Sequence, residues 1–160
     1  MEIAKFTDSS ISKSISELLN QQDQRLLVVW ATDCAEHVIM YFEEKYPRDN
    51  RPRRAIEAGR AWVRGEISIS ESRTAAFATH AAARETNQAA ACATARAAGH
   101  AAATAHVVGH AVHAATYAAK AATYAGDPNN TSVNTTKERN WQYQHLLDLG
   151  ARTNSTPSMG

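Results

Sequence analysis

The chain has 160 residues, with 17 basic and 16 acidic side chains and a formal net charge of +1 at pH 7. A chain of this length fits one domain and buries enough surface to fold without metals or cross-links. Its near-zero charge gives no strong field for nucleic acid or for an anionic membrane surface, so neither is an expected partner.

The first residues contain no basic run leading into an apolar segment, so we expect no signal peptide. No stretch has the length and apolarity of a membrane-spanning helix. The two cysteines, Cys34 and Cys92, lie in apolar or Ala-rich segments, and neither belongs to a CxxC pair. We therefore expect buried, reduced thiols in a cytoplasmic protein, with one disulfide or a reactive thiol as the alternative.

Apolar residues recur at helical spacing in the N-terminal half of the chain. They predict a weakly amphipathic helix over residues 9–20, in which many serines lower the helix propensity. A longer apolar stripe predicts a second helix from Asp23 to Tyr46, because Pro47 disfavours its continuation.

The arginine-rich segment that follows contains the signals of a third helix. Asp49 or Asn50 can cap it, and Pro52 suits its first turn, where a missing N–H costs nothing. Gly65 is suited to the left-handed conformation that ends many helices. A glycine in the middle of this helix, Gly59, indicates the close approach of a neighbouring backbone.

The Ala-rich region begins with a capping box formed by Ser68 and Glu71, which predicts a helix over residues 69–85. Residues 88–125 read as one further helix, but at the usual rise it would be about 55 Å long, more than a domain of this size is wide. We therefore predict a break between about residues 103 and 109, with the two flanking helices antiparallel. Larger side chains fill the space between the Ala-rich helices: Trp30, Phe42, Trp62 and Phe77.

The end of the chain reads as a loop at residues 126–130, a polar linker and a last helix. Thr135 and Glu138 form a second capping-box pattern, so this helix is expected to begin there and to end by Gly150. Trp141, His145, Leu146 and Leu149 would dock it onto the body of the protein. The sequence thus predicts an all-α, single-domain antiparallel bundle of about six to seven helices over residues 1–150, with an Ala-rich C-terminal half and a disordered tail at 151–160.

Polar residues within the apolar helices form the candidate buried network. Asp33 and His37 are four residues apart, and a part-buried carboxylate must find partners, one of which is expected among the arginines of residues 48–64. Two further spaced pairs need carboxylates from other helices, which predicts a polar network joining the two halves of the chain: His80 with Arg84, and Arg96 with His100. The functional alternative makes Asp33 a ligand or a catalytic base.

Three histidines share one stripe if their segment is continuously helical: His106, His110 and His113. Two histidines four apart can chelate a metal, and His113 can add a third ligand only if the helix bends. The HExxH pattern of zinc proteases is absent, because Val107 follows His106. We expect histidines held by hydrogen bonds or exposed to solvent, and therefore no metal or cofactor.

Five stretches together resemble one family of bacterial and archaeal proteins: residues 30–37, 51–62, 75–84, 95–107 and 137–145. The chain resembles the immunity proteins of the immunity-family-five-like group, which is associated with bacterial polymorphic toxin systems. The resemblance covers roughly residues 26–149. It implies an all-helical cytoplasmic protein that binds and blocks a cognate toxin, and it carries over no catalytic residue.

Two functional hypotheses follow from these patterns and from the resemblance. The first is a non-catalytic immunity protein whose partner is a cognate protein toxin, bound through a surface patch. The alternative is a helical protein that binds a metal or a small molecule through the His106, His110 and His113 stripe. The sequence does not specify the toxin, the binding surface or the oligomeric state.

Overall fold

Most of the part of the chain that the computed structural model describes, residues 4–154, is helical. This part contains eight α-helices, one 3-10 turn and no strand, which confirms the predicted all-α bundle. The count exceeds the expected six to seven because the short α3 forms a helix of its own. The elements are α1 (Ile11–Leu19), α2 (Gln24–His37), α3 (Met40–Glu43), α4 (Arg51–Val63), α5 (Ile69–Glu85), α6 (Ala89–Ala103), α7 (His110–Ala125), η1 (Pro128–Asn130) and α8 (Thr131–Asn154).

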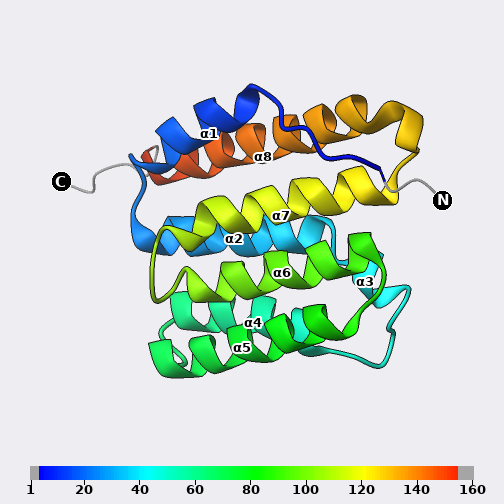
Figure 1. Ribbon diagram of the computed structural model, residues 1–160. Helices are drawn as coiled ribbons and strands as arrows, with labels where there is room; N and C mark the ends of the chain where they lie inside the picture. Colours follow the sequence, from blue (N-terminus) through cyan, green and yellow to red (C-terminus); the bar gives the residue numbers. More distant parts are fainter. Residues whose placement is uncertain (1–3, 155–160) are drawn as a thin grey trace.

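The helices lie side by side and mostly alternate in direction (Figure 1). From α5 through α8, each helix packs against the next one along the chain. Helix α2 lies behind this row and contacts α4, α6, α7 and α8, while α1 lies along α8. The two ends of the described chain therefore meet at α8, while α6 packs against α2, α3, α4, α5 and α7.

Helix α2 ends earlier than the sequence pattern indicates, so the prediction of one helix from Asp23 to Tyr46 is wrong. Val38 leaves the helical conformation, with φ −117° and ψ 6°. Val38 and Ile39 are both buried and both β-branched, a class with lowered helix propensity. The carbonyl of Val38 accepts a hydrogen bond from the Thr94 hydroxyl of α6 at 3.4 Å. The same hydroxyl donates to the Ala90 carbonyl at 2.8 Å, so its contact with Val38 is the weaker of the two.

Helix α4 has the start and the end that its sequence predicts. Asp49 caps it by accepting a hydrogen bond from the Arg51 backbone N–H at 3.1 Å, and Gly65 follows it with φ 76°. Gly59 marks the expected close approach. A Cβ at this glycine would lie 2.8 Å from Cγ2 of Thr32 and 3.8 Å from Cα of Ala102.

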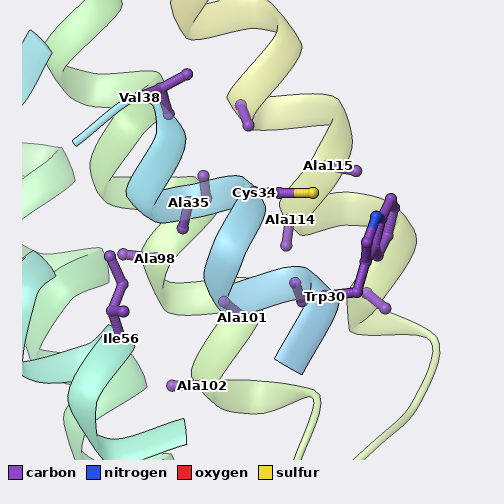
Figure 2. Close-up of a cluster of buried hydrophobic side chains, with 14 of the residues drawn as sticks. Trp30, Cys34, Ala35, Val38, Ile56, Ala98, Ala101, Ala102, Ala114 and Ala115 are labelled. Carbon is purple, nitrogen blue, oxygen red and sulfur yellow. The ribbon is translucent and has the colours of Figure 1, made fainter. Parts of the chain in front are cut away.

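The Ala-rich helices α6 and α7 form the tightest part of the core. The predicted break between them is confirmed, because α6 ends at Ala103 and α7 begins at His110. Small side chains of both helices face α2, and Figure 2 shows Cys34 directed at Ala114 and Ala115 of α7. Among the larger side chains expected to fill the core, Trp30 and Phe42 are fully buried and Trp62 is partly buried.

Phe77 is a correction to the predicted core, because its side chain is 64% exposed. It lies on the outer face of α5, next to the Arg73 guanidinium, whose Cζ is 5.8 Å from the ring centroid. The inner face of α5 packs against α6 through small residues such as Ala76 and Thr79. Alanine-to-alanine packing leaves no space there for an aromatic ring.

The beginning of α8 also differs from its prediction, because Thr135 and Glu138 form no capping box. The helix already starts at Thr131, directly after η1, whose first turn Asp127 caps. The Thr135 hydroxyl is buried and donates to the Thr131 carbonyl, and Glu138 binds a side chain of α2. The helix continues past Gly150 to Asn154, so the first four residues of the expected tail are helical. Residues 155–160 lie outside the described residues.

Both cysteines are free thiols, and Cys34 is completely buried while Cys92 is partly buried. Burial, and then the charges of Glu138 and Asp33, raise the pKa of Cys34. Within the described helices, none combines the length and the apolarity needed to cross a membrane.

Candidate functional site

Three aromatic rings stack where α2 meets α8: His37, Trp141 and His145. The His37 and Trp141 rings are nearly parallel, with their centroids 3.7 Å apart, and the Trp141 and His145 centroids are 4.9 Å apart. Trp141 thus stacks on a histidine of each helix and remains only partly exposed. We call these three side chains the stack.

Each histidine of the stack is bound to a carboxylate of the opposite helix. His37 Nδ1 lies 2.7 Å from Oε2 of Glu138, and His145 Nε2 lies 2.8 Å from Oδ2 of Asp33. Helical spacing puts each carboxylate close to the stack, because Asp33 precedes His37 by four residues and Glu138 precedes His145 by seven. Two reciprocal contacts thus hold the rings in place from both helices.

An arginine completes the shell around Asp33. Arg60 of α4 donates from Nη2 to Asp33 Oδ1 at 2.8 Å, which identifies the expected arginine partner. The same guanidinium donates to both oxygens of Glu36, at 3.1 and 3.0 Å. The hydrogen bond from Arg60 is the main cause that lowers the pKa of Glu36. Both oxygens of Asp33 are therefore engaged, and this carboxylate acts as a structural link among α2, α4 and α8.

Two hollows flank the stack on the protein surface. The first, which we call the Glu138 hollow, has a volume of about 430 Å³. Its lining is His37, Met40, Tyr41, Ala122, Ala125, Gly126, Asn134, Lys137, Glu138 and Trp141. The second, the Asp33 hollow, has a volume of about 350 Å³ and is lined by Asp33, Glu36, His37, Met40, Trp141 and His145.

Three side chains line both hollows: His37, Met40 and Trp141. Met40 is 42% exposed, and His37 is also exposed. We call these three side chains the ridge. Large apolar and aromatic groups held in fixed positions between hollows are typical of the central residues of protein interfaces.

A second cluster lies on the opposite side of the core, between α5, α6 and α7. The Arg96 guanidinium lies 2.9 Å from Nδ1 of His80, and the Nδ1 atoms of His100 and His110 are 2.9 Å apart. The ring of His100 also stacks on Tyr117, at a centroid distance of 5.3 Å. Among residues 4–152, no carboxylate is within ion-pair distance of these groups.

The missing carboxylates determine the charge of the second cluster. Burial is the main cause that lowers the pKa of His80 to about 4 and that of His100 to about 3. Nearby positive groups lower both values further, with Arg96 acting on each ring. These two histidines are therefore neutral at pH 7.

The six residues named as network candidates thus fall into two separate places. His37 belongs to the stack, and Asp33 binds its His145. His80, Arg96 and His100 belong to the cluster between α5, α6 and α7. Arg84 is exposed on α5. The α2 carboxylates Asp33 and Glu36 are instead bound to Arg60, Arg53 and His145, and Glu57 of α4 is exposed.

The histidine stripe is broken by the turn between α6 and α7. His106 lies in this turn and is exposed, so it does not continue the face that carries His110 and His113. The ring that approaches both of them is His100 of α6, at centroid distances of 5.1 and 5.3 Å. No set of three or more His, Cys, Asp or Glu side chains in the described part of the chain is arranged to hold a metal ion.

Sequence reasoning left two residues of the site without their role. Glu138 matched a capping pattern, although it contacts α2, and Met40 was placed inside a helix that in fact breaks before it. The sequence did identify Asp33 with His37 as a polar pair, and Trp141 with His145 as part of the face that docks the last helix. Only the fold brings these two faces together.

Comparison with known proteins gives one match. A family model described as "Imm-5 like putative immunity protein" matches residues 17–149. No curated protein and no solved structure matches the chain. The matched residues contain the whole stack and both of its carboxylates.

Proposed function

We propose that the chain binds a cognate protein toxin and neutralises it by occlusion. The chain belongs to the Imm-5 like family of immunity proteins, and this membership supports the proposal. The proposal makes the protein a non-catalytic, cytoplasmic binder. Its partner is the toxin, without nucleic acid, a membrane surface or a cofactor.

The observation that supports toxin binding at one part of the surface is the ridge between its two hollows. Affinity in protein interfaces comes from a few anchors in desolvated pockets, with aromatic side chains prominent among them. Rings already fixed by carboxylates lose little conformational entropy on binding. Met40 adds an adaptable apolar side chain at the same place. The ridge therefore combines an ordered centre with hollows that can receive side chains of the toxin.

Other exposed apolar residues make weaker docking surfaces. Val107, Val108 and Val112 surround the turn between α6 and α7, and Phe77 stands alone beside Arg73. None of the four valine and phenylalanine side chains lines either hollow of the stack. Phe77 is a singly exposed apolar residue, a kind that is common on protein surfaces and requires no partner. The three valines border no hollow in the described part of the chain that could receive side chains of the toxin.

Growth rescue tests the proposal. A candidate toxin, chosen from the products of genes next to the one that encodes this chain, is produced in cells together with the wild-type chain, with Met40→Glu or with the matched control Val112→Glu. Both side chains are exposed, at 42% and 37%, and Val112 lies toward the end of α7 that is remote from the Glu138 hollow. We expect rescue by the wild type and by the control.

Met40→Glu should weaken toxin binding by about 30-fold, the loss of about 2 kcal/mol that is typical of a central anchor. A calorimetric titration of the purified pair measures this change. Equal weakening by both variants, or no change from Met40→Glu, would show that the ridge is not the docking surface. Absence of rescue by the wild type would contradict the toxin-blocking function itself.

A further inference from the structure

The Glu138 carboxylate at the floor of its hollow is only half satisfied. Its side chain is 8% exposed, and Oε2 accepts a hydrogen bond from His37 at 2.7 Å. Among residues 4–152, no group donates to Oε1. Every fully buried side-chain oxygen or nitrogen in this part of the chain has a partner, so Oε1 is not fully buried. Because Glu138 lines the hollow, we infer that Oε1 is accessible from there. An almost buried carboxylate therefore presents one open oxygen to whatever enters.

Asp33 shows that the open oxygen is particular to Glu138. Both carboxylates bind a histidine of the stack, but Asp33 also accepts from Arg60, so each of its oxygens has a donor. Glu138 has no corresponding arginine. The guanidinium next to it along the chain, that of Arg139, turns the other way to bind Asp8 and Gln142. The site beside Glu138 therefore lacks the arginine that Asp33 has. Lys137 also lines the hollow, but among the described residues no hydrogen bond or ion pair joins it to Glu138.

The walls of the hollow suit the stem of a long side chain. Tyr41, Ala122 and Ala125 supply apolar surface, and Trp141 also lines the hollow. Trp141 already stacks on two histidines, whereas the Tyr41 ring has no stacking partner among the described residues and can contact an entering group. Burial raises the pKa of Tyr41, and the negative charges of Glu138 and Glu44 raise it further. The field of Glu138 therefore reaches the wall of the hollow.

We propose that the Glu138 hollow receives an arginine or lysine side chain of the toxin, whose cationic group donates a hydrogen bond to Oε1 of Glu138. This inference rests on the proposed function and adds the chemistry of the partner. A charge-assisted hydrogen bond to a nearly buried carboxylate is among the strongest that an interface can form. A neutral or acidic side chain would leave the carboxylate either weakly bound or repelled.

Nuclear magnetic resonance with small probes tests the inference without the toxin. The Trp141 indole N–H signal, assigned by comparison with Trp141→Phe, is followed while acetyl-arginine amide or acetyl-lysine amide is added to the full chain. Acetyl-citrulline amide is the neutral control, because it keeps the shape of arginine but lacks the charge. We expect saturable shifts of the Trp141 signal with at least one cationic probe and none with citrulline.

Two variants locate the binding charge. Glu138→Gln keeps the size of the side chain and its acceptor for His37, and it should lower the probe affinity at least ten-fold. Glu57→Gln, at an exposed position of α4, removes the same charge elsewhere and should leave the affinity unchanged. The circular dichroism of both variants is compared with that of the wild type to establish that they are folded, and the Trp141 shifts are read only from folded protein.

Equal shifts with citrulline, no shift with either cationic probe, or unchanged affinity in folded Glu138→Gln would overturn the inference. The proposed function fails in a different assay, through the absence of growth rescue by the wild-type chain. Rescue without probe binding would therefore retain the toxin-blocking function and reject the basic partner residue. Probe binding without rescue would retain a cation-binding hollow and reject the toxin.

Discussion

Arg139 is a buried charge that connects α8 to the N-terminal segment. Its side chain is 3% exposed and donates to both carboxylate oxygens of Asp8, at 3.0 and 2.9 Å. It also donates to Oε1 of Gln142, whose own amide donates to the Ala115 carbonyl at 2.8 Å. These contacts satisfy a guanidinium that would otherwise be costly to bury. The segment around Asp8 is therefore fixed to α8.

Replacing Asp8 by Asn should lower the free energy of unfolding by about 1–3 kcal/mol, because Arg139 stays buried and loses its counter-charge. The expected loss lies below that for a fully buried pair, since water reaches part of Asp8. Urea unfolding at pH 7 measures the change. Asp148→Asn is the control, because that carboxylate is exposed and accepts from the exposed Gln144. A loss no larger than that of the control would show that the pair does not stabilise the fold.

Gly59 provides a second test at a single position. The Cβ of Gly59→Ala would lie 2.8 Å from Cγ2 of Thr32, a buried and stiff β-branched side chain. The gain in helix propensity, about 1 kcal/mol, should be exceeded by the strain, so thermal unfolding should show a net loss of about 1–2 kcal/mol. At Gly109 a Cβ meets nothing within 4 Å, so Gly109→Ala should not destabilise. The reverse order of the two variants would contradict the packing of α4 on α2.

Among the elements, α5, α6 and α7 share an interface that carries positive and neutral groups only. Arg96, Arg84 and His110 face His80, and His80, His110, His113 and Arg96 face His100. Alanine packing brings the His100 ring centroid to 5.0 Å from that of His80 and to 5.1 Å from that of His110. Among the described residues, no carboxylate forms an ion pair with these rings. The three helices therefore pack well only while the histidines are neutral.

Acid should loosen this interface before it affects the carboxylates. The folded protein protonates His80 at a pKa of about 4 and His100 at about 3, whereas the unfolded chain protonates both at about 6.5. The unfolded state thus binds more protons between these values, so the free energy of unfolding should fall as the pH falls from about 6.5 to about 4. Urea midpoints at intervals of pH measure it.

The double variant His80→Gln and His100→Gln removes the two titrating rings from that interface. Its unfolding midpoint should depend less on pH over the same window, whereas replacement of the exposed His106 by Gln should leave the wild-type slope. The carboxylates with lowered pKa, such as Glu36 and Asp49, lose their stabilising charge only below about pH 4, the range in which free carboxyl groups become protonated. A double variant with the wild-type slope would exclude the two rings as the cause.

Local signals predicted most of the helices but not how tertiary contacts alter their ends. Capping by Ser68 and Glu71 and the length limit on residues 88–125 correctly gave α5, α6 and the break before α7. The end of α2 falls at the buried Val38, within the apolar stripe, and α8 begins directly after η1. Neither position is marked by the spacing of the apolar residues around it.

At the scale of the whole molecule, the candidate site depends on contacts between residues that are distant in the chain. His37 meets Glu138 across 101 positions, and Asp33 meets His145 across 112. Sequence spacing identified Asp33 with His37 as one polar pair and Trp141 with His145 as one docking face. It could not show that the two form one stack, because their meeting results from the packing of α2 against α8. The histidine stripe, by contrast, depended on one continuous helix and was lost at the turn.

The central claim is that this immunity-family protein blocks a toxin with the ridge beside α2, α3 and α8. Photo-crosslinking in cells that produce the toxin tests it most directly, with a crosslinking amino acid placed at position 40 or, as the comparison, at position 112. The account predicts a covalent complex with the toxin from position 40 and little or none from position 112. A complex formed from position 112 but not from position 40 would contradict the account.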